Sequence, residues 1–333
     1  MSDALAPWLQ RQLQTLLSRR GHAWLIQGPS GLGQYGLALA LAQAWLCTEP
    51  TEQGACGRCH SCHAVAVRTH PDLCVLMPET LSLELGWPLD EATQDKLDKK
   101  ERKPSKEIRV EAARQMVSFT QHTRSGGATK VVLVYPAERM NTVTANTILK
   151  TLEEPPGETR FVLASEAAHL LLPTIRSRCQ SHTLAWPTEA EALAWLTQQE
   201  VSNAEAEVLL RAAGGRPEDA LGLMAQGFDA KTWRHLPKAI AKGDTSVFAD
   251  ALPSTLIATL QKLCHDMMAA HTGASTRFFE ASDLPQAPAM DALVQWSRDL
   301  AQSARTAEHP FNAGLMLEAQ VARARMALQR RAA

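Results

Sequence analysis

Four closely spaced cysteines could hold a metal ion. Cys47, Cys56, Cys59 and Cys62 follow one another with the spacing C-x8-C-x2-C-x2-C. The thiolate is a soft, anionic ligand, and four of them suit tetrahedral zinc. Because cysteine fills all four positions, we expect a closed structural Zn²⁺ site with no open position for catalysis. Two alternatives stay open: free surface thiols, or a site in which His60 or His63 replaces one cysteine.

A glycine-rich stretch, residues 28–36, could cradle phosphate groups. It follows the apolar run 23–26, which predicts a buried strand, and precedes the Ala- and Leu-rich run 37–46, which predicts a helix. A strand, a glycine-rich loop and a helix are the context of a P-loop, whose pattern is G-x-x-x-x-G-K-[ST]. The pattern fails after its second glycine, because Gln34 stands in the lysine position and Tyr35 in the Ser/Thr position.

The two replacements remove groups that handle ATP. In a working P-loop the lysine reaches the β- and γ-phosphates and the hydroxyl holds Mg²⁺. Gln34 offers only a neutral amide, and the phenol of Tyr35 cannot sit where a small hydroxyl would. We expect the glycines to remain because the tight strand-to-helix turn needs small residues. The sequence therefore predicts a vestigial loop and no functional ATP site at Gly28, Gly31, Gly33, Gln34 and Tyr35.

The acidic partner of such a loop is also missing. Active ATPases hold Mg²⁺ with an Asp at the end of a neighbouring strand. Here the apolar run 131–135 is followed by Pro136 and Ala137, which cannot bind a metal or orient a water molecule. Glu138 lies one or two positions too far along the chain. We expect no ATP hydrolysis at this loop, and whether phosphate or nucleotide still binds there stays open.

Alternating strands and helices must position these groups. Apolar periodicity predicts strands at 23–26, 73–76, 131–135 and 160–165, and helices at 6–19, 37–46, 108–122 and 144–152. This alternation predicts an α/β fold, a doubly wound parallel sheet with helices on both faces, up to about residue 186. Beyond Pro187 the pattern predicts helices alone, at 189–197, 204–213, 256–270, 290–304 and 312–330.

Residues 77–107 differ in character from the rest of the chain. Their first part is mildly apolar, whereas residues 90–107 are dense in both acids and bases. We interpret the segment as a solvated insertion or a loose helix. A basic nucleic-acid patch is the weaker alternative, because the two signs of charge are interspersed.

Composition narrows the function classes. The 333 residues are 45% hydrophobic and carry a formal net charge of −1, so a real core is expected and a global attraction to nucleic acid is not. No apolar run approaches the length of a membrane span, and the first ten residues lack the pattern of a secretory signal, so we expect a cytoplasmic protein. The bunching of four of the seven cysteines suits a cytosolic metal site better than disulfides.

Taken together, these motifs resemble the delta-prime family of subunits of the bacterial DNA polymerase III clamp loader, a branch of the AAA+ P-loop proteins. The degenerate loop, the four-cysteine insert directly after its helix and several further segments occur in family order over most of residues 20–185. The further segments are His70-Pro71-Asp72, ANTILKTLEEPP at 145–156, FVLAS at 161–165 and TIRSRC at 174–179. The sister subunits that hydrolyse ATP keep the Lys and Thr that this loop lacks.

The resemblance gives a role to one arginine. In the family, a Ser-Arg-Cys motif supplies an arginine finger to the ATP site of the neighbouring subunit, and here that motif is Ser177-Arg178-Cys179. A guanidinium delivered in trans neutralises charge on the γ-phosphate, and such fingers are worth about 10³–10⁵ in rate. Arg178 is thus the candidate catalytic residue. Arg176 is its nearby competitor, and the plain alternative is a solvated surface arginine.

The resemblance also implies three domains and a place in an assembly. Residues 1–186 would form the P-loop α/β domain, with a zinc module at 47–62 and the charged insertion at 77–107. Residues 187–227 would form a helical lid, and 228–333 a helical collar that holds subunits together. The implied partners are the tau/gamma ATPase subunits and the delta subunit and, through the complex, the sliding clamp and primer-template DNA. No membrane partner is implied.

The implied function is that of a non-hydrolysing subunit that helps to load the sliding clamp onto primed DNA. Two other classes stay open. One is a weakly active AAA+ ATPase with an atypical P-loop, which Mg²⁺-dependent turnover by the isolated chain would reveal. The other is a zinc-containing nucleic-acid-binding protein. In that case DNA should contact the cysteine module, where Arg58 is the only fixed positive charge and no aromatic residue is present.

Overall fold

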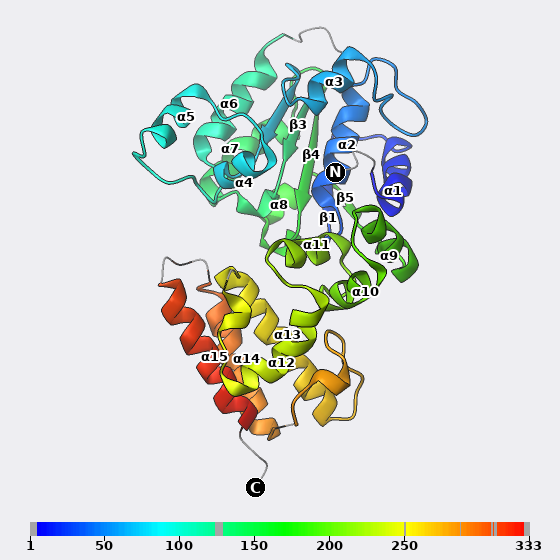
Figure 1. Cartoon of the computed structure of the whole chain (residues 1–333). Coiled ribbons are helices and arrows are strands. Elements are labelled where there is room, and N and C mark those ends of the chain that lie inside the picture. Colours follow the sequence, from blue (N-terminus) through cyan, green and yellow to red (C-terminus); the bar gives the residue numbers. More distant parts are fainter. Residues whose placement is uncertain are drawn as a thin grey trace. The chain divides into compact units, whose positions relative to one another are not determined.

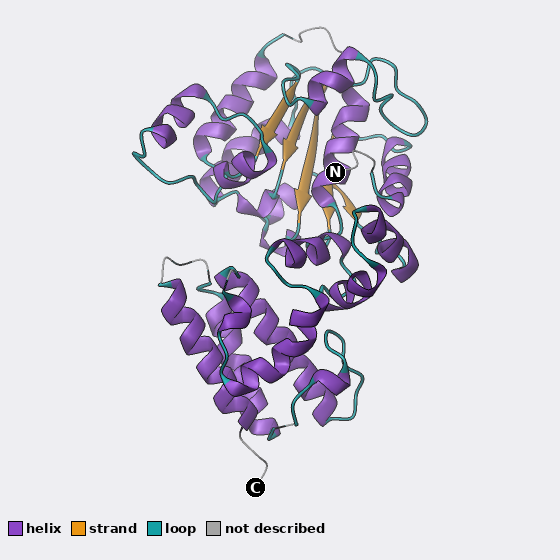
Figure 2. Cartoon of the chain, in the orientation of Figure 1, coloured by secondary structure: helices purple, strands orange, loops and turns teal. Residues whose placement is uncertain are grey.

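The computed structural model describes residues 5–123, 129–249, 251–286, 288–307, 309 and 312–329. The chain divides into two compact units, Met1–Pro187 and Thr188–Ala333. Within the described residues, the first unit combines a sheet with helices and the second consists of helices and loops (Figure 1 and Figure 2). The expected fold class, an α/β domain followed by all-α parts, is confirmed. No helix of the described residues is long and apolar enough to cross a membrane.

A five-stranded parallel sheet forms the centre of the first unit. Its strands lie in the order β2-β3-β4-β1-β5. In the register, Leu25 lies between Leu163 of one neighbouring strand and Ser181 of the other. The strands are β1 (Ala23–Gln27), β2 (Leu73–Leu76), β3 (Lys130–Val134), β4 (Thr159–Ser165) and β5 (Gln180–Thr183). Four of them match the expected ranges, whereas the polar strand β5 is not predicted by apolar patterning.

The helices of the first unit include those expected from the sequence, with ends that differ by a few residues. They are α1 (Pro7–Leu17), α2 (Gln34–Leu46), α3 (His60–Ala66), α4 (Glu79–Leu85), α5 (Glu91–Asp98), α6 (Val110–Gln121), α7 (Thr142–Glu153) and α8 (Pro173–Arg176). Two short 3-10 turns, η1 (Ala137–Arg139) and η2 (Ala168–Leu170), complete the described elements of this unit.

Helices cover both faces of the sheet. Successive strand residues point to opposite faces, so each buried strand needs two apolar partners. On one face, Leu25 and Phe161 are fully buried in a cluster with Met116 of α6, Ile148 of α7 and Ile175 of α8. On the other face, α2 contacts β3 and β4, and α1 contacts α2. This is the doubly wound arrangement that the continuous apolar strands predict.

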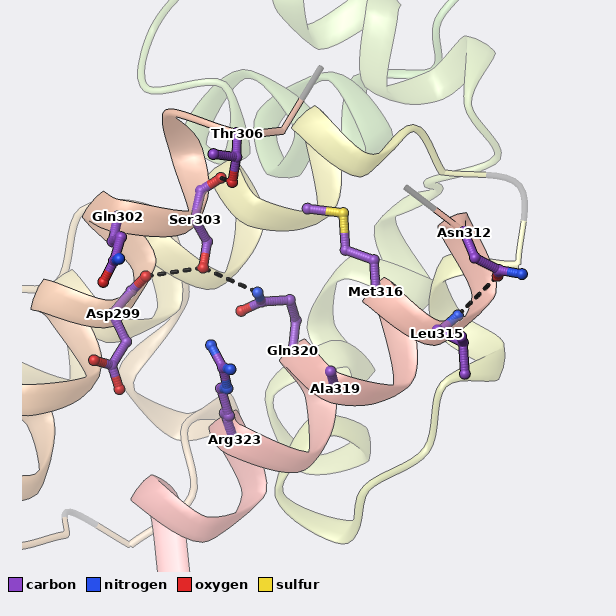
Figure 3. A pocket seen from close by; sticks show the side chains of 10 residues that line it. All are labelled: Asp299, Gln302, Ser303, Thr306, Asn312, Leu315, Met316, Ala319, Gln320 and Arg323. Carbon is purple, nitrogen blue, oxygen red and sulfur yellow. Dashed lines mark hydrogen bonds between the residues drawn. The ribbon is translucent and has the colours of Figure 1, made fainter. Parts of the chain in front are cut away.

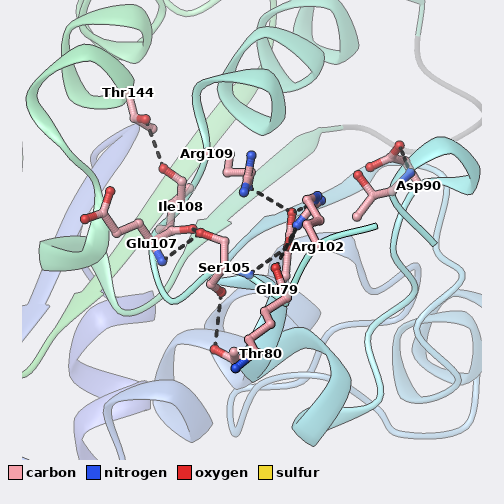
Figure 4. A network of polar contacts seen from close by, with 11 residues as sticks. Glu79, Thr80, Asp90, Arg102, Ser105, Glu107, Ile108, Arg109 and Thr144 are labelled. Carbon is pink, nitrogen blue, oxygen red and sulfur yellow. Dashed lines mark hydrogen bonds and ion pairs between the residues drawn. The ribbon is translucent and has the colours of Figure 1, made fainter. Parts of the chain in front are cut away.

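Residues 77–107 make more contacts than their sequence suggests. The segment contains helices α4 and α5, but the expectation that it is solvated is wrong for the first part, because Glu79 and Trp87 are both buried. The carboxylate of Glu79 accepts hydrogen bonds from Arg102 and from the Ser105 N–H, and it also pairs with Arg109 (Figure 4). These partners lie far from Glu79 in the sequence, so local charge patterning does not reveal them. Helix α5 has no buried residue and is solvated as expected.

The parallel strands bring distant segments to one edge of the sheet. Their carboxyl ends all lie at that edge, which is where ligands of α/β sheets usually bind. Strand β1 leads into residues 28–33 and then α2, β3 leads into Tyr135, and β4 ends at Ser165. The glycine-rich loop and the segment where an ATPase would carry its acid therefore lie at the same edge.

One hydrophobic cluster runs through the second unit. It includes Leu209, Trp233, Leu260, Trp296 and Val321, which come from five different helices. The expected division of this unit at residue 227 stays a prediction. The helices are α9 (Glu189–Gln198), α10 (Asn203–Ala212), α11 (Pro217–Ala225), α12 (Ala230–Lys242), α13 (Pro253–His271), α14 (Met290–Ala304) and α15 (Ala313–Gln329), with 3-10 turns η3 (Ser246–Phe248) and η4 (Ala281–Asp283). Residue 330, the end of the last expected helix, lies outside the described residues.

Local sequence signals fix where several of these helices begin. Thr188 and Glu191 form a reciprocal capping box at the start of α9. The Asp229 side chain accepts from the Thr232 N–H and caps α12. Pro253 occupies the first turn of α13, where its missing N–H has no helical partner to lose.

Candidate functional site

The backbone of the glycine-rich loop, residues 28–36, is fixed by its neighbours. Gly33 is the N-cap of α2 with φ of +96°, a conformation that residues with a Cβ rarely adopt. The Gly28 N–H donates to the Ser165 carbonyl at 3.2 Å, and the Trp8 indole N–H donates to the Leu32 carbonyl at 3.2 Å. The glycines thus serve the turn from strand to helix, whatever the loop binds.

The side chain of Gln34 is buried inside the loop and bonds to its backbone. The residue is only 1% exposed, and its amide nitrogen donates to the carbonyls of Gly28 at 2.8 Å and Pro29 at 2.5 Å. The side chain therefore crosslinks the loop to the first turn of α2 and brings no positive charge to it. Because its amide is neutral, this residue offers an incoming phosphate group no charge-assisted contact.

Both tyrosines of the chain lie beside this loop. The ring centroids of Tyr35 and Tyr135 are 5.3 Å apart. The Trp87 indole N–H donates to the Tyr35 hydroxyl at 2.6 Å, and the Tyr135 hydroxyl donates to Glu166 at 2.7 Å. We call Tyr35, Trp87 and Tyr135 the aromatic plug. Its members come from α2, from residues 77–107 and from the end of β3, and they meet at the carboxyl edge of the sheet.

The surroundings of the aromatic plug keep it in place. Burial raises the pKa of Tyr35, against the hydrogen bond from Trp87 and the positive charge of Arg68, so the phenol stays neutral at neutral pH. The Arg68 guanidinium lies 5.8 Å from the centroid of the Trp87 ring, within the range of a cation–π contact. Gly86 ends α4 with φ of +70°, and a Cβ there would lie 3.2 Å from Arg68. A glycine thus lets the chain turn Trp87 into the plug.

The polar groups at the strand ends bond to the chain itself. Glu138 accepts a hydrogen bond from the Glu166 N–H at 3.1 Å through one oxygen. Its other oxygen is buried and has no hydrogen-bond partner among the described residues. The Ser165 hydroxyl is buried and accepts from the Ala167 N–H at 3.2 Å. In the sequence, Glu138 lies one or two positions beyond the place where ATPases carry a metal ligand. In the structure, its carboxylate bonds to backbone.

The structure brings the four predicted metal ligands together. All four Sγ atoms lie within 4.8 Å of one another. Cys47 and Cys59 are 3.8 Å apart, and Cys56 and Cys62 are 4.0 Å apart, sulfur to sulfur. Ligand sulfurs at about 2.3 Å from a tetrahedral zinc lie roughly 3.8 Å apart, so the spacing fits a zinc site with four cysteine ligands. The neighbouring histidines are not part of this cluster.

Backbone donors around the cluster support anionic sulfur. The Cys56 N–H donates to Cys47 at 3.3 Å, and the Cys62 N–H donates to Cys59 at 3.4 Å. Hydrogen bonds from Thr48 and from the Cys62 N–H lower the pKa of Cys59 to about 5. Burial raises the pKa of Cys62, so a bound cation would be needed to ionise that thiol at neutral pH.

Arg178 follows α8 and its guanidinium is held by its own chain. One terminal nitrogen donates to the Thr174 carbonyl at 3.0 Å, and the other lies 3.0 Å from a carboxylate oxygen of Glu153. The side chain is 31% exposed, so part of it remains open to solvent. The competitor Arg176 is the last residue of α8. The structure thus shows Arg178 as a positioned arginine and not as a freely solvated one.

Sequence patterns do not reveal several of these neighbours. The residues around Trp87 give no indication that it contacts Tyr35. The pairing of Glu153 with Arg178 and of Glu166 with Tyr135 is equally hidden in the sequence. One signal was available for Tyr135, because the chain has only two tyrosines, one at the Ser/Thr position of the loop and one at the end of the apolar run 131–135.

A separate pocket of about 500 Å³ lies between α14 and α15 in the second unit (Figure 3). The Ser303 hydroxyl accepts from Gln320 at 3.0 Å and donates to the Asp299 carbonyl at 2.9 Å. No predicted site residue lies in it. The lining residues are Asp299, Gln302, Ser303, Thr306, Asn312, Leu315, Met316, Ala319, Gln320 and Arg323.

Comparisons with known proteins give one consistent result for the sequence. Residues 2–187 match the family model described as DNA polymerase III, delta subunit. A DNA polymerase III subunit delta' from Pseudomonas aeruginosa is 40% identical over 231 residues, which cover 68% of this chain and 63% of the relative. The subunit delta' from Escherichia coli is 36% identical over 235 residues, covering 68% and 62%. The matched region thus spans less than two thirds of the length of these relatives.

Among solved structures, a DNA polymerase III gamma subunit-related protein from Thermotoga maritima is similar over 96% of this chain and 100% of its own, with 18% sequence identity and a TM-score of 0.49.

Proposed function

The chain belongs to the DNA polymerase III delta-subunit family, and we propose from this membership that it serves in the clamp loader without hydrolysing ATP itself. The contacts that Gln34 and Tyr35 make at the glycine-rich loop are the observation that supports this most. Gln34 bonds to the carbonyls of the loop, and Tyr35 of the aromatic plug stands at the Ser/Thr position that holds Mg²⁺ in a P-loop ATPase. The role would lie in the cytoplasm, as part of the assembly that loads the sliding clamp onto primed DNA.

Titration of the isolated chain with labelled ATP tests whether the loop at residues 28–36 binds or hydrolyses ATP. We expect no saturable binding in the micromolar range and no Mg²⁺-dependent turnover. Micromolar affinity together with turnover would instead establish the alternative, an active ATPase with an atypical loop.

We propose that Arg178 acts as an arginine finger on the ATP of an adjacent tau/gamma subunit. Its position after α8 and its partly exposed, positioned guanidinium support this role. In a reconstituted loader, Arg178→Ala is expected to leave assembly intact and to lower the ATPase rate that DNA and clamp stimulate, because a trans guanidinium stabilises charge on the γ-phosphate. Arg176→Ala is the matched control. Wild-type turnover of the Arg178 variant would contradict the assignment.

We propose that the four cysteines bind one structural zinc ion. The sulfur spacing and the closed set of four cysteine ligands support zinc, and elemental analysis of the purified chain should give about one zinc per chain. Residues 228–333 would supply the collar through which this chain meets the delta and tau/gamma subunits, and residues 187–227 would form the lid.

A further inference from the structure

The ion pair of Arg178 and Glu153 joins two elements that are anchored in the same core. Glu153 is the last residue of α7 and follows Leu152, which is fully buried. Arg178 lies three residues after Ile175 of α8, which is also fully buried, and its N–H donates to the Ile175 carbonyl at 3.1 Å. Both side chains therefore start from backbone that the core holds.

Helix stability does not account for an acid at this position. The carboxyl end of a helix carries partial negative charge, so Glu153 at the end of α7 is electrostatically unfavourable for the helix itself. The side chain is 55% exposed, and its carboxylate reaches the Arg178 guanidinium at 3.0 Å. The adjacent Glu154 is also exposed and makes no ion pair with a described residue. The two neighbouring acids thus differ mainly in their relation to Arg178.

The guanidinium is oriented by its own chain but not saturated. Glu153 and the Thr174 carbonyl each take one terminal nitrogen. The third nitrogen, Nε, is buried without a hydrogen-bond partner among the described residues. An arginine side chain has large rotamer freedom, and a planar guanidinium must be aligned before it can bind phosphate oxygens. Two fixed contacts restrict that freedom and leave other N–H donors for an incoming anion.

We infer that Glu153 is a positioning residue that aligns the guanidinium of Arg178 for the phosphate groups of a nucleotide bound to an adjacent subunit. This inference rests on the proposed role of Arg178. Glu153 itself touches no nucleotide in this scheme. It acts through Arg178, whose partly exposed guanidinium keeps further N–H donors for the phosphate while the contact with Glu153 is maintained.

A double-mutant cycle in the reconstituted loader tests the inference. Glu153→Ala is expected to lower the stimulated kcat for ATP by about two- to fivefold with little change in KM, because alignment of the finger matters in the transition state. Glu153→Gln keeps an acceptor oxygen without the charge and should give a rate between wild type and the alanine variant. In the Arg178→Ala background, Glu153→Ala should cause no further loss of kcat. If Glu153 only supported the structure, the second substitution would lower kcat further.

Glu154→Ala is the matched control and should retain the wild-type kcat, and the thermal midpoint of the isolated Glu153→Ala chain should match wild type. A wild-type or faster rate for either Glu153 variant, an equal loss in the Glu154 variant, or a further loss in the Arg178→Ala background would overturn the inference. Wild-type turnover by Arg178→Ala alone would instead overturn the finger assignment, so the two failures are distinguishable.

Discussion

Glu79 is a carboxylate held by three donors. Its oxygens accept from the guanidinium of Arg102 and the N–H of Ser105, and Arg109 lies 3.2 Å away. Burial raises the pKa of Glu79, but the hydrogen bonds from Arg102 and Ser105 and the charges of the two arginines outweigh burial, so its pKa is lower than usual. These contacts tie both ends of residues 77–107 together.

The lowered pKa predicts a pH-dependent contribution to stability. A group whose pKa is lowered by folding stabilises the native state fully above its usual value of 4.5, and this stabilisation is lost as the pH falls through the lowered pKa. Glu79→Gln should therefore reduce the free energy of unfolding by about 1–3 kcal/mol at neutral pH. The difference from wild type should shrink below about pH 4.

Chemical denaturation at several pH values measures this difference. Glu84→Gln, on the exposed side of the same helix, is the matched control and should change stability little at any pH. A Glu79→Gln deficit that stays constant down to about pH 3 would contradict the assigned charge state.

For single residues, the sequence shows which P-loop side chains are replaced. It does not show which contacts the replacing side chains make. The P-loop pattern shows directly that Gln34 and Tyr35 cannot act as Lys and Ser/Thr. It contains no information on Trp87, which lies 52 positions along the chain and meets Tyr35 only through the tertiary fold. The pairing of Arg178 with Glu153 is hidden for the same reason, because both are polar residues without a local signal.

At the scale of elements, the strongest apolar runs predict their strands well. β3 and β4 are buried almost throughout, so their composition alone identifies them. β5 lies at the edge of the sheet, its residues are largely exposed, and it pairs through backbone with β1. Such a strand needs no apolar residues and cannot be found from hydrophobicity.

The end of α4 supports the aromatic plug, so loss of Trp87 should destabilise the first unit. The indole is 8% exposed and bonds to Tyr35. Trp87→Ala should cost about 3–5 kcal/mol, because it leaves a cavity and removes a donor from the Tyr35 hydroxyl. The free energy of unfolding from urea titration measures the effect.

Trp186→Ala is a suitable control, because that indole is 47% exposed, and its effect should stay within about 0.5 kcal/mol. Equal effects of the two tryptophan substitutions would show that Trp87 is not packed in the plug.

At the scale of the whole molecule, the two units have separate hydrophobic clusters. Leu25, Ile148 and their neighbours form one in the first unit, and Leu260 belongs to the cluster of the second. Independent cores predict independent cooperative unfolding. We therefore expect two transitions in denaturant for the full chain.

Core substitutions can assign these transitions. Ile148→Ala should shift only one of them and Leu260→Ala only the other, each by about 2–5 kcal/mol, because both side chains are fully buried. Intrinsic fluorescence and far-UV circular dichroism would follow them. A single transition that both substitutions shift would show that the units unfold as one.

The aromatic plug also predicts how the loop would respond to substitutions toward the P-loop pattern. Tyr35→Thr would remove the acceptor of the Trp87 N–H and one half of the ring pair. Gln34→Lys would bring a charge to a position that is 1% exposed, without a counter-ion until phosphate is bound. Either substitution alone is therefore expected to lower stability, so that restoring one P-loop group at a time costs free energy of folding.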